Sequence, residues 1–223
     1  MQITILKRMD LQLYYITDRR QFAGGCHEQE RRLLAKIAEC AAAGMDYVQL
    51  REKDLTPRAL EELARKAMAA LGGTHTRLLI NSRTDVALAC GAHGVHLPAK
   101  DLAASEVRAI FARVNKAEPV IGVSTHSAAE IASAEAHAAS FAVFGPVFEK
   151  SGSANREGLE QLRQICHRAE VARLPMPVWA LGGITLENAQ QCVAAGAAGI
   201  AAIRLFQEND VAKIVKQLRA LQL

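Results

Sequence analysis

The chain has 223 residues and a net charge of +4, and half of its residues are hydrophobic while only 4% are aromatic. This length suits one α/β barrel domain, and the composition predicts an aliphatic core of Ala, Leu, Ile and Val. The modest, evenly spread charge argues against a nucleic-acid partner, and no segment reaches the roughly 20 apolar residues of a membrane span.

Short apolar segments alternate with helical patterns along the chain. Unbroken apolar runs of this length are typical of parallel strands that are covered on both faces. The predicted strands are Leu11–Thr17, Tyr47–Arg51, Leu78–Asn81, Gly94–Leu97, Val120–Val123, Phe141–Gly145, Val178–Leu181 and Gly199–Ile203. The predicted helices are Glu28–Ala43, Pro57–Leu71, Thr84–Cys90, Ala104–Arg113, Ser127–Ala138, Leu159–Arg173, Leu186–Ala195 and Asp210–Leu221.

Eight strand–helix units predict right-handed βαβ connections that close into a (β/α)8 TIM barrel, an α/β fold. No linker rich in proline or serine divides the chain, so residues 1–223 are expected to form a single domain with an N-terminal extension at 1–10. The alternative is an open doubly wound sheet. It is less favoured, because no GxGxxG pattern follows the first strand and because eight units match barrel closure.

The five cysteines are widely spaced and form no CxxC pair. They are therefore expected to be free thiols in a reducing compartment, rather than a disulfide or zinc framework. The apolar stretch of the first ten residues, MQITILKRMD, is too short for a secretory signal. A cytoplasmic location is expected.

Charged, polar and glycine residues follow the predicted strands. In a closed parallel barrel these positions meet at one mouth and form the catalytic rim. Cationic side chains follow seven of the eight strands if His126 is counted, and such a ring suits phosphate or pyrophosphate. The rim residues are Asp18, Arg19, Arg20, Arg51, Glu52, Lys53, Ser82, Arg83, Lys100, Asp101, Ser124, His126, Lys150, Ser151, Gly182, Gly183 and Arg204.

Several rim positions have a specific chemical use. Arg51 and Lys53 would face one pyrophosphate if the extended geometry of their strand continues. The Gly182–Gly183 pair lies between an apolar strand and a helix, a pattern that lets backbone N–H groups cradle a phosphate. Asp101 is suited to hold magnesium and equally suited to cap a helix.

Two histidines and one loop complete the candidate site. His126 follows a strand and is suited to acid–base chemistry, or alternatively to a polar helix start. His96 lies inside a strand and is expected to be a satisfied barrel histidine. The segment Glu149–Glu157 is rich in Lys, Ser, Gly and Asn and is expected to be a loop that covers a ligand.

Eight segments, in order, carry a family resemblance: YYITDRR, VQLREKD, LLINSRTDVALACGAHGVHL, KDL, IGVSTHS, VFGPVF, ALGGIT and AGAAGIAAI. Over nearly its whole length the chain resembles the superfamily of thiamine-phosphate synthase and thiazole tautomerase. The resemblance implies a transferase of thiamine biosynthesis that joins hydroxymethylpyrimidine pyrophosphate to thiazole phosphate and releases pyrophosphate. Its partners would be these small phosphorylated substrates, and its helical outer faces allow a homodimer.

The resemblance also implies roles for individual residues. Gln49, Arg51, Lys53, Asn81 and Ser124 match positions that bind the pyrimidine pyrophosphate, Asp101 matches a Mg2+ ligand, and Gly183 matches a contact to the thiazole phosphate. Together with the rim chemistry, this makes Arg51, Lys53, Ser124 and His126 the catalytic candidates. The further substrate-binding candidates are Gln49, Asn81, Lys150, Gly182, Gly183 and Arg204.

The chain departs from the synthase pattern at four places. Ser82 stands where the synthase has a magnesium carboxylate, and Pro98-Ala99 replaces Gly-Gln. In the loop after the sixth strand a Thr-x-Thr-Lys is lost, with Lys150 displaced and Ser153 at the lysine position. Arg204 replaces a serine after the eighth strand, and Lys150 and Arg204 are expected to supply the lost positive charge.

These departures keep two alternatives open. A thiazole tautomerase only moves a proton and needs no magnesium carboxylates, and its proposed acid–base histidine matches His126. A catalytically silent barrel that binds a phosphorylated thiamine precursor is the third interpretation. The synthase is preferred, because Arg51, Lys53 and Asp101 have a clear use in it.

Overall fold

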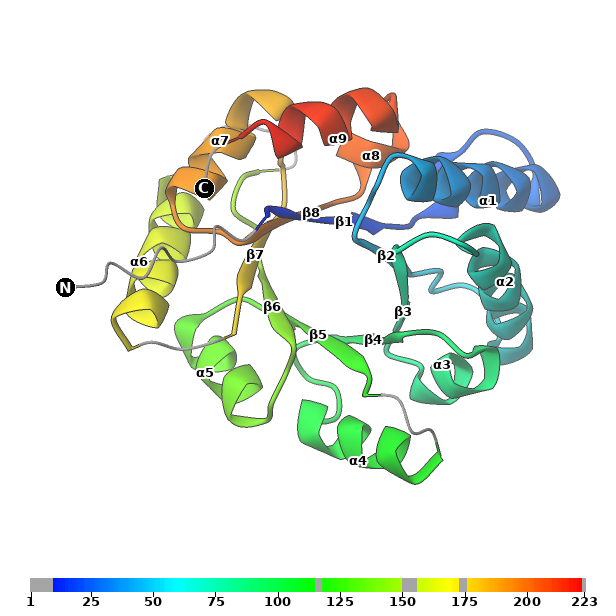
Figure 1. Cartoon of the computed structure of the whole chain (residues 1–223), viewed down its shortest axis with the longest axis horizontal. Coiled ribbons are helices and arrows are strands. Elements are labelled where there is room, and N and C mark those ends of the chain that lie inside the picture. Colours follow the sequence, from blue (N-terminus) through cyan, green and yellow to red (C-terminus); the bar gives the residue numbers. More distant parts are fainter. Residues whose placement is uncertain (1–9, 115–117, 150–155, 173–175, 222–223) are drawn as a thin grey trace.

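The strands close into a parallel barrel in sequence order, β1 to β8, with β8 paired to β1 (Figure 1). The computed structural model describes residues 10–114, 118–149, 156–172 and 176–221. The strands are β1 Gln12–Ile16, β2 Tyr47–Leu50, β3 Arg77–Asn81, β4 Gly94–Leu97, β5 Val120–Thr125, β6 Phe141–Phe144, β7 Val178–Leu181 and β8 Gly199–Ala202. The predicted (β/α)8 barrel is therefore confirmed.

Helices surround the barrel on its outside (Figure 1). They are α1 Cys26–Ala42, α2 Pro57–Ala70, α3 Thr84–Cys90, α4 Ala104–Val114, α5 Ala128–Ala136, α6 Arg156–Ala172, α7 Leu186–Ala194 and α9 Val211–Arg219. Two short helices lie where rim loops were expected, namely η1, a 3-10 helix at Arg19–Gln21, and α8 at Arg204–Gln207. The expected loop at Glu149–Glu157 ends earlier than predicted, because α6 begins at Arg156.

The core has two layers of different composition. Between strands and helices it is mainly aliphatic, as predicted, but the barrel interior contains Tyr14, Phe141 and Trp179. The rings of Phe141 and Trp179 stack with centroids 3.6 Å apart. A Cβ atom at Gly122 would come within 2.4 Å of the Phe141 ring, and one at Gly199 within 2.7 Å of Trp179. Glycine on neighbouring strands thus makes room for the aromatic side chains, which the composition alone does not reveal.

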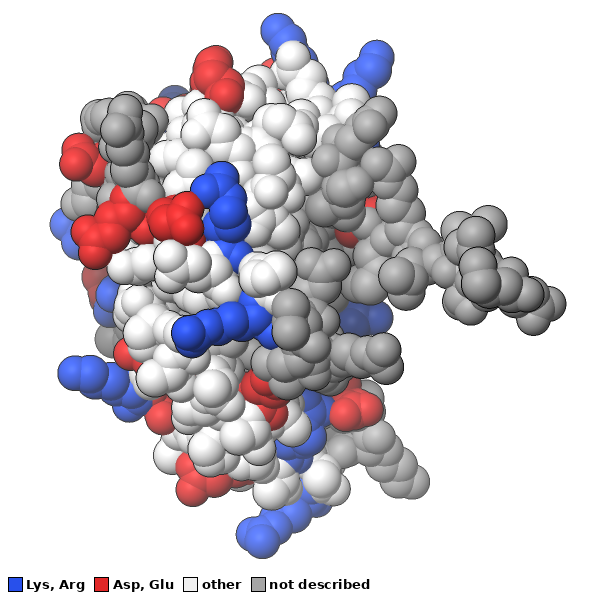
Figure 2. All heavy atoms as spheres, turned by 90° about the vertical axis from the view of Figure 1, so that its left-hand side faces the viewer, with Lys and Arg blue, Asp and Glu red and all other residues white. Residues whose placement is uncertain are grey.

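The charged residues seen in Figure 2 do not form a patch of one sign. Lys and Arg side chains are interspersed with Asp and Glu on the face that lies on the left of Figure 1. This face lacks the basic stripe that is typical of nucleic-acid-binding proteins. In the described part of the chain, no helix has both the length and the apolar character that crossing a membrane requires.

Candidate active site at the carboxyl ends of the strands

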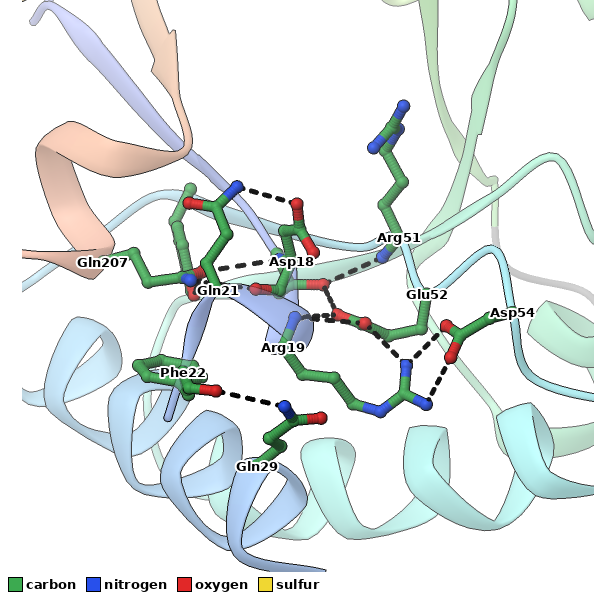
Figure 3. A network of polar contacts seen from close by, with 11 residues as sticks. Asp18, Arg19, Gln21, Phe22, Gln29, Arg51, Glu52, Asp54 and Gln207 are labelled. Carbon is green, nitrogen blue, oxygen red and sulfur yellow. Dashed lines mark hydrogen bonds and ion pairs between the residues drawn. The ribbon is translucent and has the colours of Figure 1, made fainter. Parts of the chain in front are cut away.

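A buried ion-pair network joins the ends of β1 and β2 (Figure 3). The Arg19 guanidinium donates to Glu52 Oε2 at 3.0 Å and holds both carboxylate oxygens of Asp54, at 2.7 and 2.8 Å. The Thr17 hydroxyl donates to Glu52 Oε1 at 2.6 Å and accepts from the backbone N–H of Arg51 at 2.9 Å. The network therefore fixes the backbone from which the Arg51 side chain extends.

Burial and ion pairing act in opposite directions on the acids of this network. Glu52 is only 5% exposed, and burial raises the pKa of its carboxyl, although hydrogen bonds from Thr17 and Arg19 partly offset the rise. Hydrogen bonds from Arg19 lower the pKa of Asp54, which lies nearer to solvent. Burial thus acts against ionisation of Glu52, whereas the hydrogen bonds from Thr17 and Arg19 act in its favour. Arg19 itself is 5% exposed, so this expected rim cation serves the fold rather than a ligand.

Arg51 extends away from the Arg19 network (Figure 3) and is half-buried. Its positive charge contributes, less than burial does, to the lowered pKa of His96 in β4. Lys53 does not continue an extended strand, because β2 ends at Leu50 and Lys53 lies exposed in a turn. The geometric reason for expecting Arg51 and Lys53 to face one anion is therefore wrong.

His96 is the centre of the polar contacts between β1, β4 and β5. It is 2% exposed, with Nδ1 at 3.2 Å from the Tyr14 hydroxyl and Nε2 at 2.8 Å from Ser124 Oγ. Gln49 is 1% exposed and donates through Nε2 to the Tyr14 hydroxyl at 3.1 Å. Burial, with a smaller contribution from Arg51, lowers the pKa of His96 to about 3, so the ring is neutral. The expectation of a satisfied barrel histidine is confirmed.

The ends of β3 and β4 bring Asn81, Ser82 and Asp101 to the same part of the mouth. Asn81 lies opposite His96 in the register of β3 and β4, and the backbone N–H of Ser82 donates to the His96 carbonyl at 2.8 Å. The Ser82 hydroxyl donates to Asp101 Oδ2, and Asp101 Oδ1 accepts from Leu102 N at 2.8 Å. Asn81 and Ser124 thus lie next to His96, and Ser82 links Asp101 to the same end of β4.

Asp101 fits a magnesium ion that a substrate phosphate also binds, but it does not fit a site made of protein carboxylates alone. In the described part of the chain, no group of three His, Cys, Asp or Glu side chains is arranged to hold a metal. The neighbour of Asp101 is the Ser82 hydroxyl, which supplies no negative charge. Magnesium is often held by one or two carboxylates together with substrate phosphates and water, and one carboxylate is present here.

A second group of candidate residues lies at β7 and β8. A cavity of about 270 Å³ is lined by Gly183, Thr185, Arg204 and others, among them the acids Glu187 and Glu208. Gly183 has a φ of +59°, and a Cβ there would lie 2.0 Å from the Glu149 carbonyl oxygen. The glycine pair is therefore required by the close approach of the β6–α6 connection. Gly183 still lines the cavity at the start of α7.

The remaining candidates lie elsewhere. His126 Nδ1 donates to the Gly145 carbonyl at 2.6 Å, and the residue lines a groove of about 240 Å³ with Gln164 and Arg168 of α6. Its neighbour Ser127 caps α5 by accepting from Glu130 N at 3.2 Å, as a helix start predicts. Among the described residues, the hydrogen bonds of His126 go to Glu130 and Gly145 and not to His96 or Ser124. Lys150 and Ser153 lie outside the described residues.

Other expected rim cations also have partners or positions that separate them from the residues around His96. Arg83 forms an ion pair with Asp85 at 2.5 Å, and Lys100 is exposed. The residue that the sequence did not single out is Tyr14, which joins Gln49 to His96. Its neighbour Tyr15 bonds instead to Gln207 Oε1 at 2.7 Å.

Comparisons with known proteins agree with this architecture. The family model described as thiamine monophosphate synthase matches residues 13–206. A protein of Geobacter sulfurreducens, provisionally named a thiamine-phosphate synthase, is 42% identical over 97% of this chain and 96% of its own length. Thiamine-phosphate synthase of Methanoregula boonei is 38% identical over 95% of this chain and 93% of its own.

A solved structure gives the same result. Thiamine phosphate pyrophosphorylase from Pyrococcus furiosus superposes with a TM-score of 0.76 at 29% identity, covering 95% of both chains. The family model and the curated relatives each span most of the chain. The chain therefore belongs to the thiamine monophosphate synthase family.

Proposed function

We propose that this protein couples hydroxymethylpyrimidine pyrophosphate to thiazole phosphate and releases pyrophosphate. The observation that carries the proposal is the fixed position of Arg51 at the end of β2, where its backbone N–H donates to the Thr17 hydroxyl and its half-buried side chain extends away from the Arg19 network (Figure 3). A guanidinium that is held in place by a buried network suits the terminal anion of a pyrophosphate. Family membership supports the same reaction.

In the proposed reaction, the bond between the pyrimidine methylene carbon and the pyrophosphate oxygen breaks, and the electron pair leaves with the oxygen. The thiazole nitrogen then forms the new bond to the methylene carbon. Arg51 and Ser124 donate hydrogen bonds to the leaving pyrophosphate, where negative charge develops. Asn81, at the same part of the mouth, is proposed to orient the pyrimidine pyrophosphate. Magnesium held by Asp101 would neutralise part of the pyrophosphate charge.

The thiazole phosphate is proposed to bind at the β7–β8 side of the mouth. Gly183 and the start of α7 line the cavity there, and Arg204 supplies positive charge. Helix N-termini in this part of parallel barrels commonly hold phosphate groups. Lys150 is proposed as a further cation for the same phosphate.

A thiazole tautomerase is the second candidate. It is favoured by the lone carboxylate at Asp101, because Ser82 supplies no second magnesium ligand. It would use His126 for proton transfer at Nε2, because Nδ1 donates to the Gly145 carbonyl. The location of His126 in the α5–α6 groove makes this candidate weaker than the synthase.

An assay with both thiamine precursors distinguishes these functions. Purified protein is given the pyrimidine pyrophosphate and the thiazole phosphate, with and without magnesium, and pyrophosphate and thiazole isomers are quantified. Pyrophosphate release that requires both substrates is the expected result. Isomerisation of the thiazole without pyrophosphate release would replace the synthase with the tautomerase, and binding with neither reaction would indicate a silent barrel.

A cytoplasmic location is proposed from the cysteines, and the partners are proposed from the reaction. The five cysteines are unpaired, with Cys40 and Cys192 buried, which suits a reducing compartment such as the cytoplasm. Burial raises the pKa of both thiols to about 12, so neither is a reactive thiolate. The proposed partners are the two phosphorylated substrates, and a homodimer stays a prediction.

The Ser82–Asp101 pair gives a specific prediction for magnesium. Ser82→Asp is expected to strengthen magnesium binding in the presence of inorganic pyrophosphate at least about fivefold, because a second carboxylate contributes about 1 kcal/mol even in water-like surroundings. Aspartate tolerates the left-handed backbone at this position, where φ is +62°. Calorimetric titration measures the affinity directly, and Asp101→Asn is expected to weaken it. Unchanged affinity in both variants would remove Asp101 from the metal site.

A further inference from the structure

Four side chains from four strands form a continuous hydrogen-bonded chain across the barrel interior. Gln49 of β2 bonds to Tyr14 of β1, Tyr14 to His96 of β4, and His96 to Ser124 of β5, at 3.1, 3.2 and 2.8 Å. The first three are at most 2% exposed, whereas Ser124 is half-buried. This series of hydrogen bonds therefore runs from the buried interior to Ser124, which lines a cavity together with Asp101.

The donors and acceptors in this series allow hydrogen-bond donation in one direction, which begins at Gln49 and ends at Ser124. The amide nitrogen of Gln49 only donates, so the Tyr14 oxygen accepts from it. Tyr14 is fully buried and has one proton, and leaving that proton without an acceptor would cost desolvation energy. Tyr14 therefore donates to His96 Nδ1, the nitrogen that lies 3.2 Å away.

This direction of donation determines which tautomer of the His96 imidazole is present. His96 is neutral and accepts at Nδ1, so its single proton is on Nε2. That proton is donated to Ser124 Oγ at 2.8 Å. With one lone pair occupied by His96, the Ser124 hydroxyl keeps its own proton for donation to another acceptor.

We infer that Gln49, Tyr14 and His96 are positioning residues that fix the Nε2–H tautomer of His96 and thereby hold Ser124 as a hydrogen-bond donor to an anionic leaving group. This inference rests on the proposed function for the identity of that group, pyrophosphate. These three residues exert the inferred effect through Ser124, and no proton leaves the series of hydrogen bonds during the reaction. Gln49, which family resemblance assigns to substrate binding, acts here through Tyr14.

The tautomer is measured without substrate. The full chain is labelled with 15N-histidine, and long-range 15N–1H spectra identify the protonated ring nitrogen of each histidine. The signals of His96 are those that disappear in His96→Gln. A protonated Nε2 and an unprotonated Nδ1 are expected. A proton on Nδ1 would overturn the inference, because His96 would then donate to Tyr14 and accept from Ser124.

Tyr14→Phe tests the functional consequence. It removes the donor to Nδ1, so kcat and the affinity for inorganic pyrophosphate are each expected to fall on the order of tenfold. The KM for the thiazole substrate is expected to stay unchanged. Tyr47→Phe is the matched control, because Tyr47 packs against Trp179 with ring centroids 5.1 Å apart but is not part of the chain. Unchanged kcat and pyrophosphate affinity in folded Tyr14→Phe would overturn the inference.

Two variants of His96 distinguish hydrogen-bond donation to Ser124 from the packing of the side chain in the barrel interior. The amide of glutamine can place an N–H near the Nε2 position, whereas methionine fills similar space without a donor. His96→Gln is expected to retain pyrophosphate affinity on the order of tenfold better than His96→Met. Equal affinities in the two folded variants would contradict a role for donation to Ser124. Failure of the wild type to release pyrophosphate would instead refute the synthase, and the tautomer and the pyrophosphate affinity would still be measurable.

Discussion

Arg51→Ala is expected to slow pyrophosphate release by about 10²–10³-fold, the usual effect of removing one donor that stabilises developing charge. The guanidinium extends from a backbone held by Thr17, so its position is fixed before the pyrophosphate leaves. Removing it leaves Ser124 as the remaining donor of the pair. The measurement is steady-state pyrophosphate release with both substrates at saturation.

Two further variants show whether the slower release in Arg51→Ala comes from loss of the Arg51 guanidinium. Arg51→Lys keeps the charge but loses the planar fork, so an intermediate rate is expected. Arg58→Ala is the control, because Arg58 is an exposed arginine of α2 whose partner is Glu62 at 3.2 Å. A rate in Arg51→Ala equal to that of the control would show that the pyrophosphate does not bind at Arg51.

Arg19→Met is expected to lower the free energy of unfolding by about 3–5 kcal/mol, because it leaves the Glu52 carboxylate buried without its charge partner. Glu52 is 5% exposed and receives hydrogen bonds from both the backbone and the side chain of Arg19. Only the side-chain bond is lost in the variant. Urea unfolding at pH 7 measures the difference.

The loss of unfolding free energy in Arg19→Met should depend on pH. Burial already raises the pKa of Glu52, so the folded state binds its proton more tightly than the unfolded state, and this group's contribution to stability falls as pH rises above its unfolded pKa. Without Arg19 this pKa rises further, which extends the fall to higher pH. Arg19 also lowers the pKa of Asp54, and the stability that this provides is lost only on acidification below the ordinary pKa of that carboxyl, 3.8. The gap between wild type and variant should therefore be smaller at pH 5 than at pH 8.

A double variant provides the control. Arg19→Met with Glu52→Gln removes the buried charge as well as its partner, so about half of the lost stability is expected to return. Arg20→Met changes an exposed arginine in the same segment and should have little effect. A gap between wild type and Arg19→Met that widens on acidification would contradict the account of Glu52.

The barrel was predictable because its signal is local. Each strand is a short apolar run, and β4 and β7 have the predicted bounds, Gly94–Leu97 and Val178–Leu181. The end of β5 was not predictable to the residue. The strand continues to Thr125, so Ser124 lies within it and contacts His96, whereas His126 lies beyond it at the start of α5.

The positions of Tyr14 and Arg19 were not predictable for a different reason. Tyr14 and Tyr15 are adjacent and chemically identical, and only the orientation of β1 decides which one faces the barrel interior. Arg19 follows a strand as Arg51 does, but its partner Glu52 lies 33 positions away in the sequence. The sequence alone does not distinguish an arginine that binds a ligand from one that forms a buried ion pair, because the partner is brought close only by the fold.

The most direct test of the account is a crystal structure of the protein with inorganic pyrophosphate and magnesium. The account predicts that the anion lies at the mouth of the barrel, within hydrogen-bonding distance of the Arg51 guanidinium and Ser124 Oγ. Pyrophosphate bound instead in the groove between α5 and α6, on His126 and Arg168, with the mouth around Arg51 empty, would contradict it.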